Sequence, residues 1–139
     1  MLKGKLLHPE ILGVLGQAGH GSKILIADGN YPFSTGSLST TPIVFLNLSP
    51  GLCTVTQVLD ALLDAIEVEA AEVMVPDDGS RPPIFTEFEK MLPESIKLTD
   101  RGRFEFYDLV KSSDTALVIA TGEQRIYANL LLTIGVRLP

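Results

Sequence analysis

Several residue types and patterns that carry common functions are scarce in this sequence or missing from it. Cys53 is the only cysteine, which excludes a disulfide within the chain and favours a reducing compartment. The 11 basic residues are scattered singly among 17 acidic ones, so no cationic patch exists to bind nucleic-acid phosphates. No apolar run approaches the roughly 20 residues of a membrane span, and the first residues lack the apolar stretch of a secretory signal. We therefore expect a cytoplasmic protein with no membrane partner and no nucleic-acid partner.

Motifs that bind nucleotides and metals are missing as well. The segment Gly19-His20-Gly21-Ser22 lacks the lysine and the spacing of a phosphate-binding loop, and no G-x-G-x-x-G follows the first apolar run. Two distant histidines and one cysteine form no recognisable zinc cluster, and no G-x-S-x-G motif surrounds Ser22. We expect neither a metal nor another cofactor.

What the sequence does contain is an excess of apolar residues for its size. Its 139 residues fit one domain, spanning residues 1–139. Apolar residues make up 45% and charged residues 20%, and the mean hydropathy is +0.27. A small monomer needs more polar cover than this, because its surface is large relative to its volume. The excess predicts that part of the surface is buried between subunits.

Apolar runs of strand length alternate with segments whose apolar residues have helical spacing. Helices are expected to begin at Pro9, at Thr54 or Thr56, at Ile84 and near Phe104. Strands are expected at Lys23–Ala27, Ile43–Leu46, Val73–Val75, Ser95–Leu98, Ala116–Ala120 and Leu130–Ile134. This alternation predicts an α/β domain with a largely parallel central sheet between helical layers, a three-layer α/β/α arrangement.

His20 lies between two glycines, which let the chain turn sharply and leave the imidazole uncrowded. Histidine exchanges protons near neutral pH, so His20 is the strongest acid–base candidate in the chain. The alternative is a loop histidine that only hydrogen-bonds the backbone. The other histidine, His8, precedes Pro9 at a helix start, where a structural or solvent-facing role is expected.

Asp28 follows the first apolar strand, and ligands of open α/β sheets bind beyond the carboxyl ends of strands. A carboxylate there can accept hydrogen bonds from sugar hydroxyls or hold a histidine. Alternatively, Asp28 is a turn residue that bonds the backbone of Gly29 and Asn30. Tyr127 and Asn129 are two residues apart, so in an extended segment they face the same side and can contact one ligand. Structural hydrogen bonding explains that pair as well.

Two charged residues have open interpretations. Arg103 can offer a charged fork to ligand oxygens, or it is a surface residue before a helix. Glu123 can bind or orient a ligand, but for an isolated glutamate exposure to solvent is expected.

Several short motifs, taken in order, resemble the D-ribose pyranase / L-fucose mutarotase family over almost the whole chain. Gly19-His20-Gly21 followed by Asp28-Gly29-Asn30-Tyr31-Pro32 is similar to the N-terminal motif of the fucose mutarotases. The segments Arg103-Phe104-Glu105-Phe106-Tyr107 and Thr121-Gly122-Glu123 also resemble that branch. The ribose pyranases are more similar at Gln57-Val58-Leu59, at Glu67-Val68-Glu69-Ala70-Ala71 and at Tyr127-Ala128-Asn129.

Two positions bear on which sugar the resemblance implies. Ser22 stands where the fucose mutarotases usually carry an aspartate, and their central Arg-Ala-Asp-Gly-like segment is absent here. Arg103 stands where they carry arginine and the ribose pyranases carry histidine, which favours L-fucose over D-ribose.

The resemblance implies an enzyme without a cofactor that interconverts the anomers, or the pyranose and furanose forms, of a monosaccharide. It implies the fold of that family and a homodecamer of two stacked pentameric rings, with sites near subunit boundaries. It also implies that His20 is the proton donor and that Asp28, Arg103, Tyr127, Ala128 and Asn129 contact the sugar. The alternatives are a non-catalytic sugar-binding or transport-accessory protein on the same fold, and a purely structural oligomer.

Overall fold

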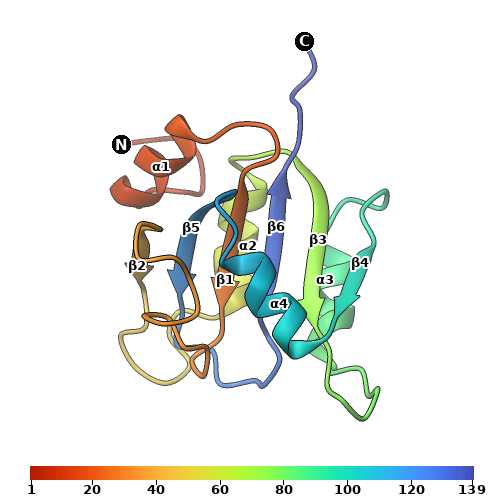
Figure 1. Cartoon of the computed structure of the whole chain (residues 1–139). Coiled ribbons are helices and arrows are strands. Elements are labelled where there is room, and N and C mark those ends of the chain that lie inside the picture. The colour runs from red at the N-terminus through yellow and green to blue at the C-terminus, as the bar shows by residue number, and fades with distance from the viewer.

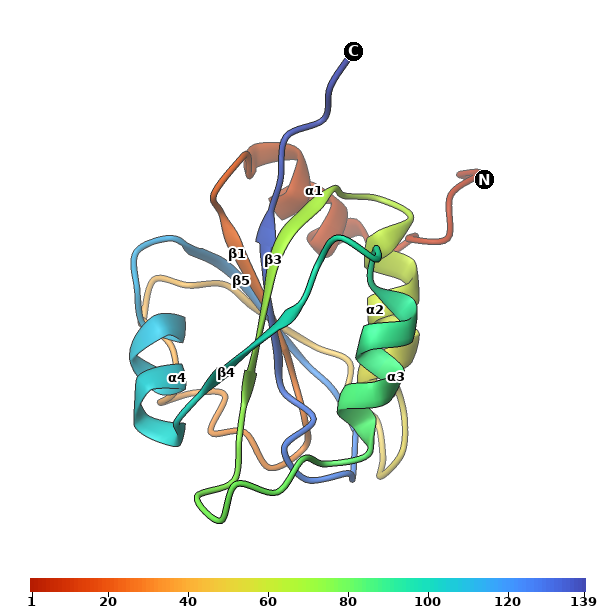
Figure 2. The same cartoon turned by 90° about the vertical axis from the view of Figure 1, so that its right-hand side faces the viewer.

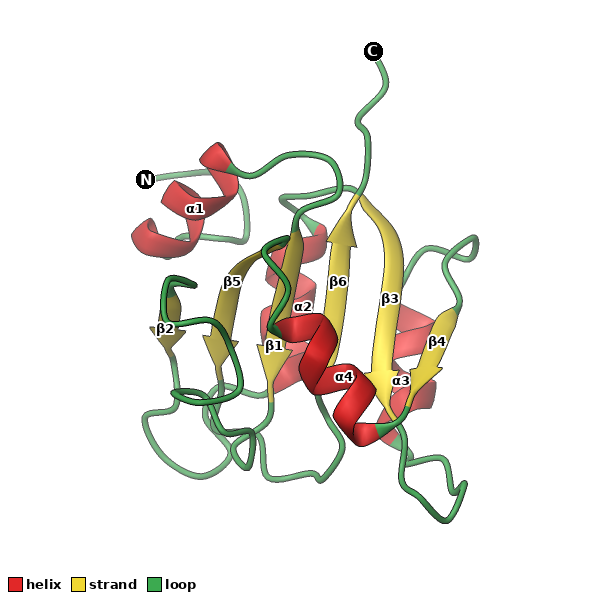
Figure 3. Ribbon diagram, in the orientation of Figure 1, coloured by secondary structure: helices red, strands yellow, loops and turns green.

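Six strands form one mixed sheet in the computed structural model, which describes all residues from 1 to 139. The strands are β1 (Lys23–Ala27), β2 (Ile43–Phe45), β3 (Val68–Met74), β4 (Leu98–Arg101), β5 (Thr115–Ala120) and β6 (Leu130–Ile134). Their order across the sheet is β2-β5-β1-β6-β3-β4 (Figure 1). β6 is antiparallel to its neighbours β1 and β3, whereas the other adjacent pairs are parallel. The amino end of β6 therefore lies at the same end of the sheet as the carboxyl ends of β1 and β3 (Figure 3).

Helices cover both faces of this sheet. α2 (Val55–Leu63) and α3 (Ile84–Met91) lie on one face and α4 (Arg103–Val110) on the other, while α1 (Pro9–Gln17) lies at the end opposite the carboxyl ends of the parallel strands (Figures 1 and 2). Side chains alternate between the faces of a strand. In β1, Ile24 and Ile26 join the core beneath α2 and α3, whereas Leu25 and Ala27 join the core beneath α4. The protein thus has two cores, one on each side of the sheet.

Local sequence explains where two of the helices begin. Thr54 caps α2 in a reciprocal arrangement: its hydroxyl accepts the N–H of Gln57 at 3.3 Å, and the Gln57 side chain accepts the N–H of Thr54 at 2.9 Å. His8 stands before α1, where its Nδ1 accepts the N–H of Ile11 at 3.5 Å, and Pro9 is the first helical residue. His8 therefore has the structural position that the sequence predicts.

The predicted three-layer arrangement and largely parallel sheet are confirmed, and the differences concern element bounds. β3 begins at Val68, five residues before the predicted strand, because its pairing with β6 extends back to that residue. The strand predicted at Ser95–Leu98 is instead β4, Leu98–Arg101. Ile96 belongs to a turn, since its N–H donates to the carbonyl of Pro93 at 2.8 Å.

A single chain leaves several large apolar side chains exposed to solvent. Phe104 at the start of α4 is 77% exposed and Ile126 is 66% exposed. Phe45 at the end of the edge strand β2 and Leu48 shortly after it are exposed as well. No helix is both long enough and apolar enough to cross a membrane. Nor are three or more histidine, cysteine, aspartate or glutamate side chains grouped so that they could hold a metal ion.

Candidate functional site

Residues that are distant in sequence lie together at one end of the sheet, where β1 and β3 end and β6 begins. Leu130 of β6 pairs with Ile26 of β1 on one side and with Val73 of β3 on the other. Because β6 is antiparallel, the residues just beyond these pairs leave the sheet side by side. They are Asp28 after β1, Met74 at the end of β3 and Asn129 before β6.

Asp28 and Asn129 are joined by two hydrogen bonds in a buried position. The backbone N–H of Asp28 donates to Oδ1 of Asn129 at 2.8 Å, and Nδ2 of Asn129 donates to Oδ2 of Asp28 at 3.0 Å. Oδ2 also accepts the N–H of Ala128 at 3.1 Å, and Oδ1 accepts the N–H of Asn30 at 2.9 Å. A carboxylate offers about four acceptor positions. Internal donors use three of them, which leaves room for a hydroxyl of a ligand.

A pocket of about 160 Å³ opens beside this carboxylate. Its walls are formed by Asp28, Asn30, Tyr31, Met74, Arg103, Tyr107, Tyr127 and Asn129. Pockets for drug-sized ligands measure roughly 300–1,000 Å³. The space in one chain therefore suits a small ligand or part of a site that a second chain completes.

Aromatic rings and one cation form another part of the pocket wall. Arg103 and Tyr107 lie one turn apart on α4, and the Arg103 guanidinium is 5.7 Å from the centre of the Tyr107 ring. Tyr107 meets Tyr31 edge to face, with ring centres 5.6 Å apart. The Tyr31 hydroxyl donates to the carbonyl of Gly36 at 2.7 Å. Arg103 is exposed and forms no ion pair, so its donors are available to ligand oxygens.

Tyr127 holds an uncommon backbone conformation. Its φ is +58°, in the left-handed region that residues other than glycine seldom adopt. The next residue, Ala128, is fully buried and directs its N–H to Asp28. The turn at Tyr127 thus places the phenol in the pocket wall and the following N–H on the carboxylate.

Burial governs the electrostatics of Asp28, which is 2% exposed. Removal from water raises the pKa of its carboxyl above the usual range, and the N–H groups of Asn30 and Ala128 offset only part of that rise. An aspartate with a raised pKa accepts a proton more readily than one in water does. Asp28 can therefore take part in proton transfer as well as bind hydroxyl groups.

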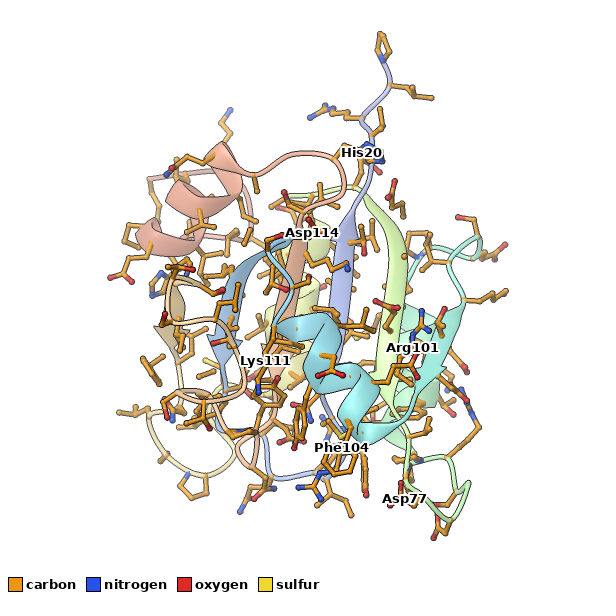
Figure 4. All side chains as sticks on the ribbon, in the orientation of Figure 1. His20, Asp77, Arg101, Phe104, Lys111 and Asp114 are labelled. Atoms are coloured by element: carbon orange, nitrogen blue, oxygen red, sulfur yellow. The ribbon has the colours of Figure 1, made fainter.

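The structure brings together Asp28, Arg103, Tyr127, Ala128 and Asn129 but places His20 elsewhere. His20 precedes β1 and Asp28 follows it, and the five residues of β1 rise about 3.3 Å each, so roughly 15 Å or more separates them. In Figure 4, His20 lies at the opposite end of the sheet from Phe104 of α4. The imidazole is 61% exposed, and its Nε2 lies 2.8 Å from Oε2 of Glu69. His20 and Asp28 of one chain therefore do not act on the same ligand.

The structure also adds pocket residues that were not predicted to contact a ligand, namely Tyr31, Met74 and Tyr107. Tyr31 and Tyr107 had an available signal, since both lie in segments that resemble the fucose mutarotases and Tyr107 is four residues from Arg103 on one helix. The expectation that Glu123 faces solvent is wrong. Glu123 is 3% exposed, because Arg125 and the start of α2 surround its carboxylate with N–H donors.

The pocket of this α/β protein combines a carboxylate, an amide and a guanidinium with aromatic faces, groups that are able to bind the hydroxyls of a small ligand. A sequence profile of the RbsD / FucU transport protein family matches residues 1–137. The chain is 36% identical to a fucose mutarotase of Mus musculus, with 96% of this chain and 94% of the relative covered. It is 32% identical to a D-ribose pyranase of Streptomyces avermitilis, with 98% of each covered. The structure of Bacillus subtilis RbsD complexed with D-ribose has a TM-score of 0.84 and 27% identity, covering 99% of this chain and all of that one, 100%. The chain belongs to the RbsD / FucU family.

Proposed function

We propose that the protein is a monosaccharide mutarotase, an isomerase that opens and recloses the sugar ring and prefers L-fucose to D-ribose. The observation that supports this most is the buried carboxylate of Asp28, whose pKa is raised and which retains a free acceptor position beside Asn129. The relatives named fucose mutarotase and D-ribose pyranase support the same reaction class. Arg103 supports the preference for L-fucose.

Opening a cyclic hemiacetal moves two protons and breaks one bond. The anomeric hydroxyl loses its proton and becomes a carbonyl, while the bond from the anomeric carbon to the ring oxygen breaks and that oxygen gains a proton. Positioned acid–base groups each accelerate such steps roughly 10²–10⁴-fold. Rotation about the opened chain, followed by the reverse steps, gives the other anomer or ring size.

Each residue of the site has a role in this proposal. His20 exchanges the proton of the ring oxygen, and Asp28 and Asn129 orient hydroxyl groups or assist the transfer. Tyr127 packs against the sugar, the Ala128 N–H keeps Asp28 in place, and Arg103 binds a ring substituent. These roles need no metal and no organic cofactor.

Because His20 lies at the opposite end of β1 from Asp28, the proposal requires that His20 act in the pocket of a neighbouring protomer. The exposed Phe104 and Ile126, which flank the pocket residues Arg103 and Tyr127, support a subunit contact there. We propose a homodecamer of two stacked pentameric rings, in the cytoplasm, as the working assembly.

Saturation-transfer NMR on L-fucose and D-ribose tests the activity directly. Added protein is expected to speed exchange between anomers or ring forms, more for L-fucose than for D-ribose. The variant His20→Ala should lose exchange far more than sugar affinity, because the proton is needed only during ring opening. The matched control is His8→Ala, which removes the other histidine and should leave exchange unchanged. Exchange rates that do not change with added protein, for either sugar, would remove the enzymatic proposal.

The description of the family as transport proteins favours one alternative, a sugar-binding accessory protein without catalysis. Tight binding of either sugar in the same NMR samples, without faster exchange, would favour that alternative.

A further inference from the structure

The irregular segment between β5 and β6 carries three residues of the pocket region, Tyr127, Ala128 and Asn129. No helix or strand fixes this segment. Its conformation includes the left-handed turn at Tyr127, which costs of the order of 1–3 kcal/mol and persists only where surrounding contacts hold it. Hydrogen bonds to Asp28 hold its end at Ala128 and Asn129. Further contacts hold its start a few residues earlier, at Glu123 and Arg125.

Glu123 anchors the start of the segment to two other parts of the fold. Its carbonyl accepts the N–H of Gly29, the residue after Asp28, at 2.8 Å. Its carboxylate accepts the N–H of Val55 at the start of α2 at 3.3 Å. Glu123 is therefore attached both to the chain beside Asp28 and to a helix of the opposite layer.

Arg125 continues this connection to α3. Its Nε and backbone N–H donate to Oε1 of Glu123 at 3.0 and 3.1 Å, and a terminal nitrogen donates to Oε2 at 2.8 Å. The other terminal nitrogen donates to both carboxylate oxygens of Glu87 on α3 at 2.9 Å. We call these three residues the Glu123–Arg125–Glu87 bridge. A planar guanidinium can satisfy two carboxylates in this way, and an ammonium group cannot.

We propose that Glu123 and Arg125 are positioning residues, which hold Tyr127, Ala128 and Asn129 in the geometry that binds the sugar beside Asp28. Neither side chain lines the pocket, so they act through the segment and not on the ligand. This inference rests on the proposed function for its catalytic readout. It has no other dependence on that function, because the position of the segment can be measured without a sugar.

Charge supports the same role for the bridge. Burial alone raises the pKa of the Glu123 carboxyl, but hydrogen bonds and the charge of Arg125 together bring it below the usual value. Glu123 is therefore ionised at neutral pH, and its interaction with Arg125 persists under assay conditions.

The chain offers a matched control for Arg125. Arg81 also pairs with two carboxylates, those of Asp100 and Glu89, and both arginines line the cavity of about 750 Å³ on the other side of Tyr127. Arg81 has no hydrogen bond to the segment that carries the pocket residues. Arg125→Lys and Arg81→Lys each replace a guanidinium group in the wall of the same cavity by an ammonium group. Only Arg125→Lys changes the Glu123–Arg125–Glu87 bridge.

In the assembled protein, Arg125→Lys should lower kcat for sugar exchange about tenfold or more, because a displacement near 1 Å can cost up to 10²-fold in rate. Arg81→Lys should stay within about twofold of the wild type. Both are to be compared at a temperature where thermal melts show each variant folded, so that a loss of stability alone leaves kcat unchanged. Equal kcat values for both variants and the wild type would overturn the proposal, as would equal losses in the two variants.

Hydrogen exchange of the Ala128 N–H, which donates to Asp28, provides a readout independent of catalysis. Arg125→Lys should speed its exchange about tenfold or more and Arg81→Lys should not. If the wild type fails to exchange sugar forms, the proposed function is lost but this measurement still decides the role of the bridge. Should Arg125→Lys fail to fold, Glu87→Ala removes the half-exposed outer contact. Faster exchange at Ala128 in that variant supports the bridge, and unchanged exchange overturns it.

Discussion

Replacing Asn129 by aspartate tests the arrangement of the pocket most severely. In the native protein the Asn129 amide donates to Oδ2 of Asp28 at 3.0 Å, and both residues are almost completely buried. Asn129→Asp keeps the size and shape of the side chain but sets a second carboxylate against the first. The added oxygen has no proton to donate, so the hydrogen bond becomes a contact between two acceptors.

The energetic cost depends on whether the new pair keeps a proton. Two charges 3.0 Å apart repel by about 5 to 6 kcal/mol at an effective dielectric constant of about 20. Protonating one carboxyl at pH 7, from an ordinary pKa of about 3.9, costs about 4 kcal/mol. Proton uptake therefore costs less free energy than the repulsion of two charges, and the pair shares one proton in the folded state. We expect Asn129→Asp to lose up to about 4 kcal/mol of unfolding free energy at pH 7, and less to the extent that burial already raises the pKa of Asp28.

The sign of the pH dependence follows from proton uptake. The folded variant binds one proton more than its unfolded chain, so its stability falls as pH rises, by about 1.4 kcal/mol per pH unit between pH 4 and the raised pKa. Urea unfolding of variant and wild type at pH 5, 6 and 7 measures the difference at each pH. The control Asn129→Ala leaves the N–H of Asp28 without an acceptor and removes one donor to its carboxylate, and it should cost about 1–3 kcal/mol with a shallower pH dependence, because it adds no second carboxylate. A cost for Asn129→Asp that is the same at pH 5 and pH 7 would show that the folded pair takes up no proton.

Two further predictions concern the segment that precedes the pocket. Gly122→Ala should lower the unfolding free energy by about 2 kcal/mol or more in urea titrations, because an added Cβ would overlap the carbonyl oxygens of Ser49 and Leu52. Gly13→Ala in α1 meets no heavy atom within 4 Å and should gain roughly 0.5–1 kcal/mol, so equal effects at the two glycines would contradict this packing. Glu123 has a pKa below the usual 4.5, so its stabilising effect is complete above that pH and is lost as pH falls through the folded value. Between pH 5 and pH 3 the wild type should therefore lose stability more steeply than Glu123→Gln, and parallel curves would count against the ion pair.

Much of the fold could be predicted from the sequence because its signals are local. The apolar runs of β1, β5 and β6 and the helical spacing in α2 mark those elements without reference to the rest of the chain. β4 was misplaced because its position depends on pairing with β3, a contact that no local pattern encodes. The antiparallel direction of β6 is likewise set by its place between β1 and β3.

Some residues of the candidate site also have local sequence signals, whereas others are placed only by contacts between distant segments. Asp28 and Asn129 could be selected by type and position, since each adjoins an apolar strand. Met74 carries no chemical signal, and it lines the pocket only because β3 ends beside β6. The burial of Glu123 depends on a cation two residues away and on the start of α2, so an isolated glutamate in the sequence wrongly indicated exposure to solvent. The separation of His20 from Asp28 follows once β1 is placed between them.

Sugar exchange in this proposal needs a pocket from one protomer and His20 from the next, and two inactive variants can be mixed to measure whether it does. His20→Ala retains an intact pocket, whereas Asp28→Asn retains an intact His20. Each variant alone is expected to lose sugar exchange. In randomly mixed oligomers about one quarter of the subunit contacts combine a native pocket with a native His20. We predict that oligomers assembled from an equal mixture recover about a quarter of the wild-type exchange rate in saturation-transfer NMR, whereas no recovery from mixed oligomers would contradict the shared site.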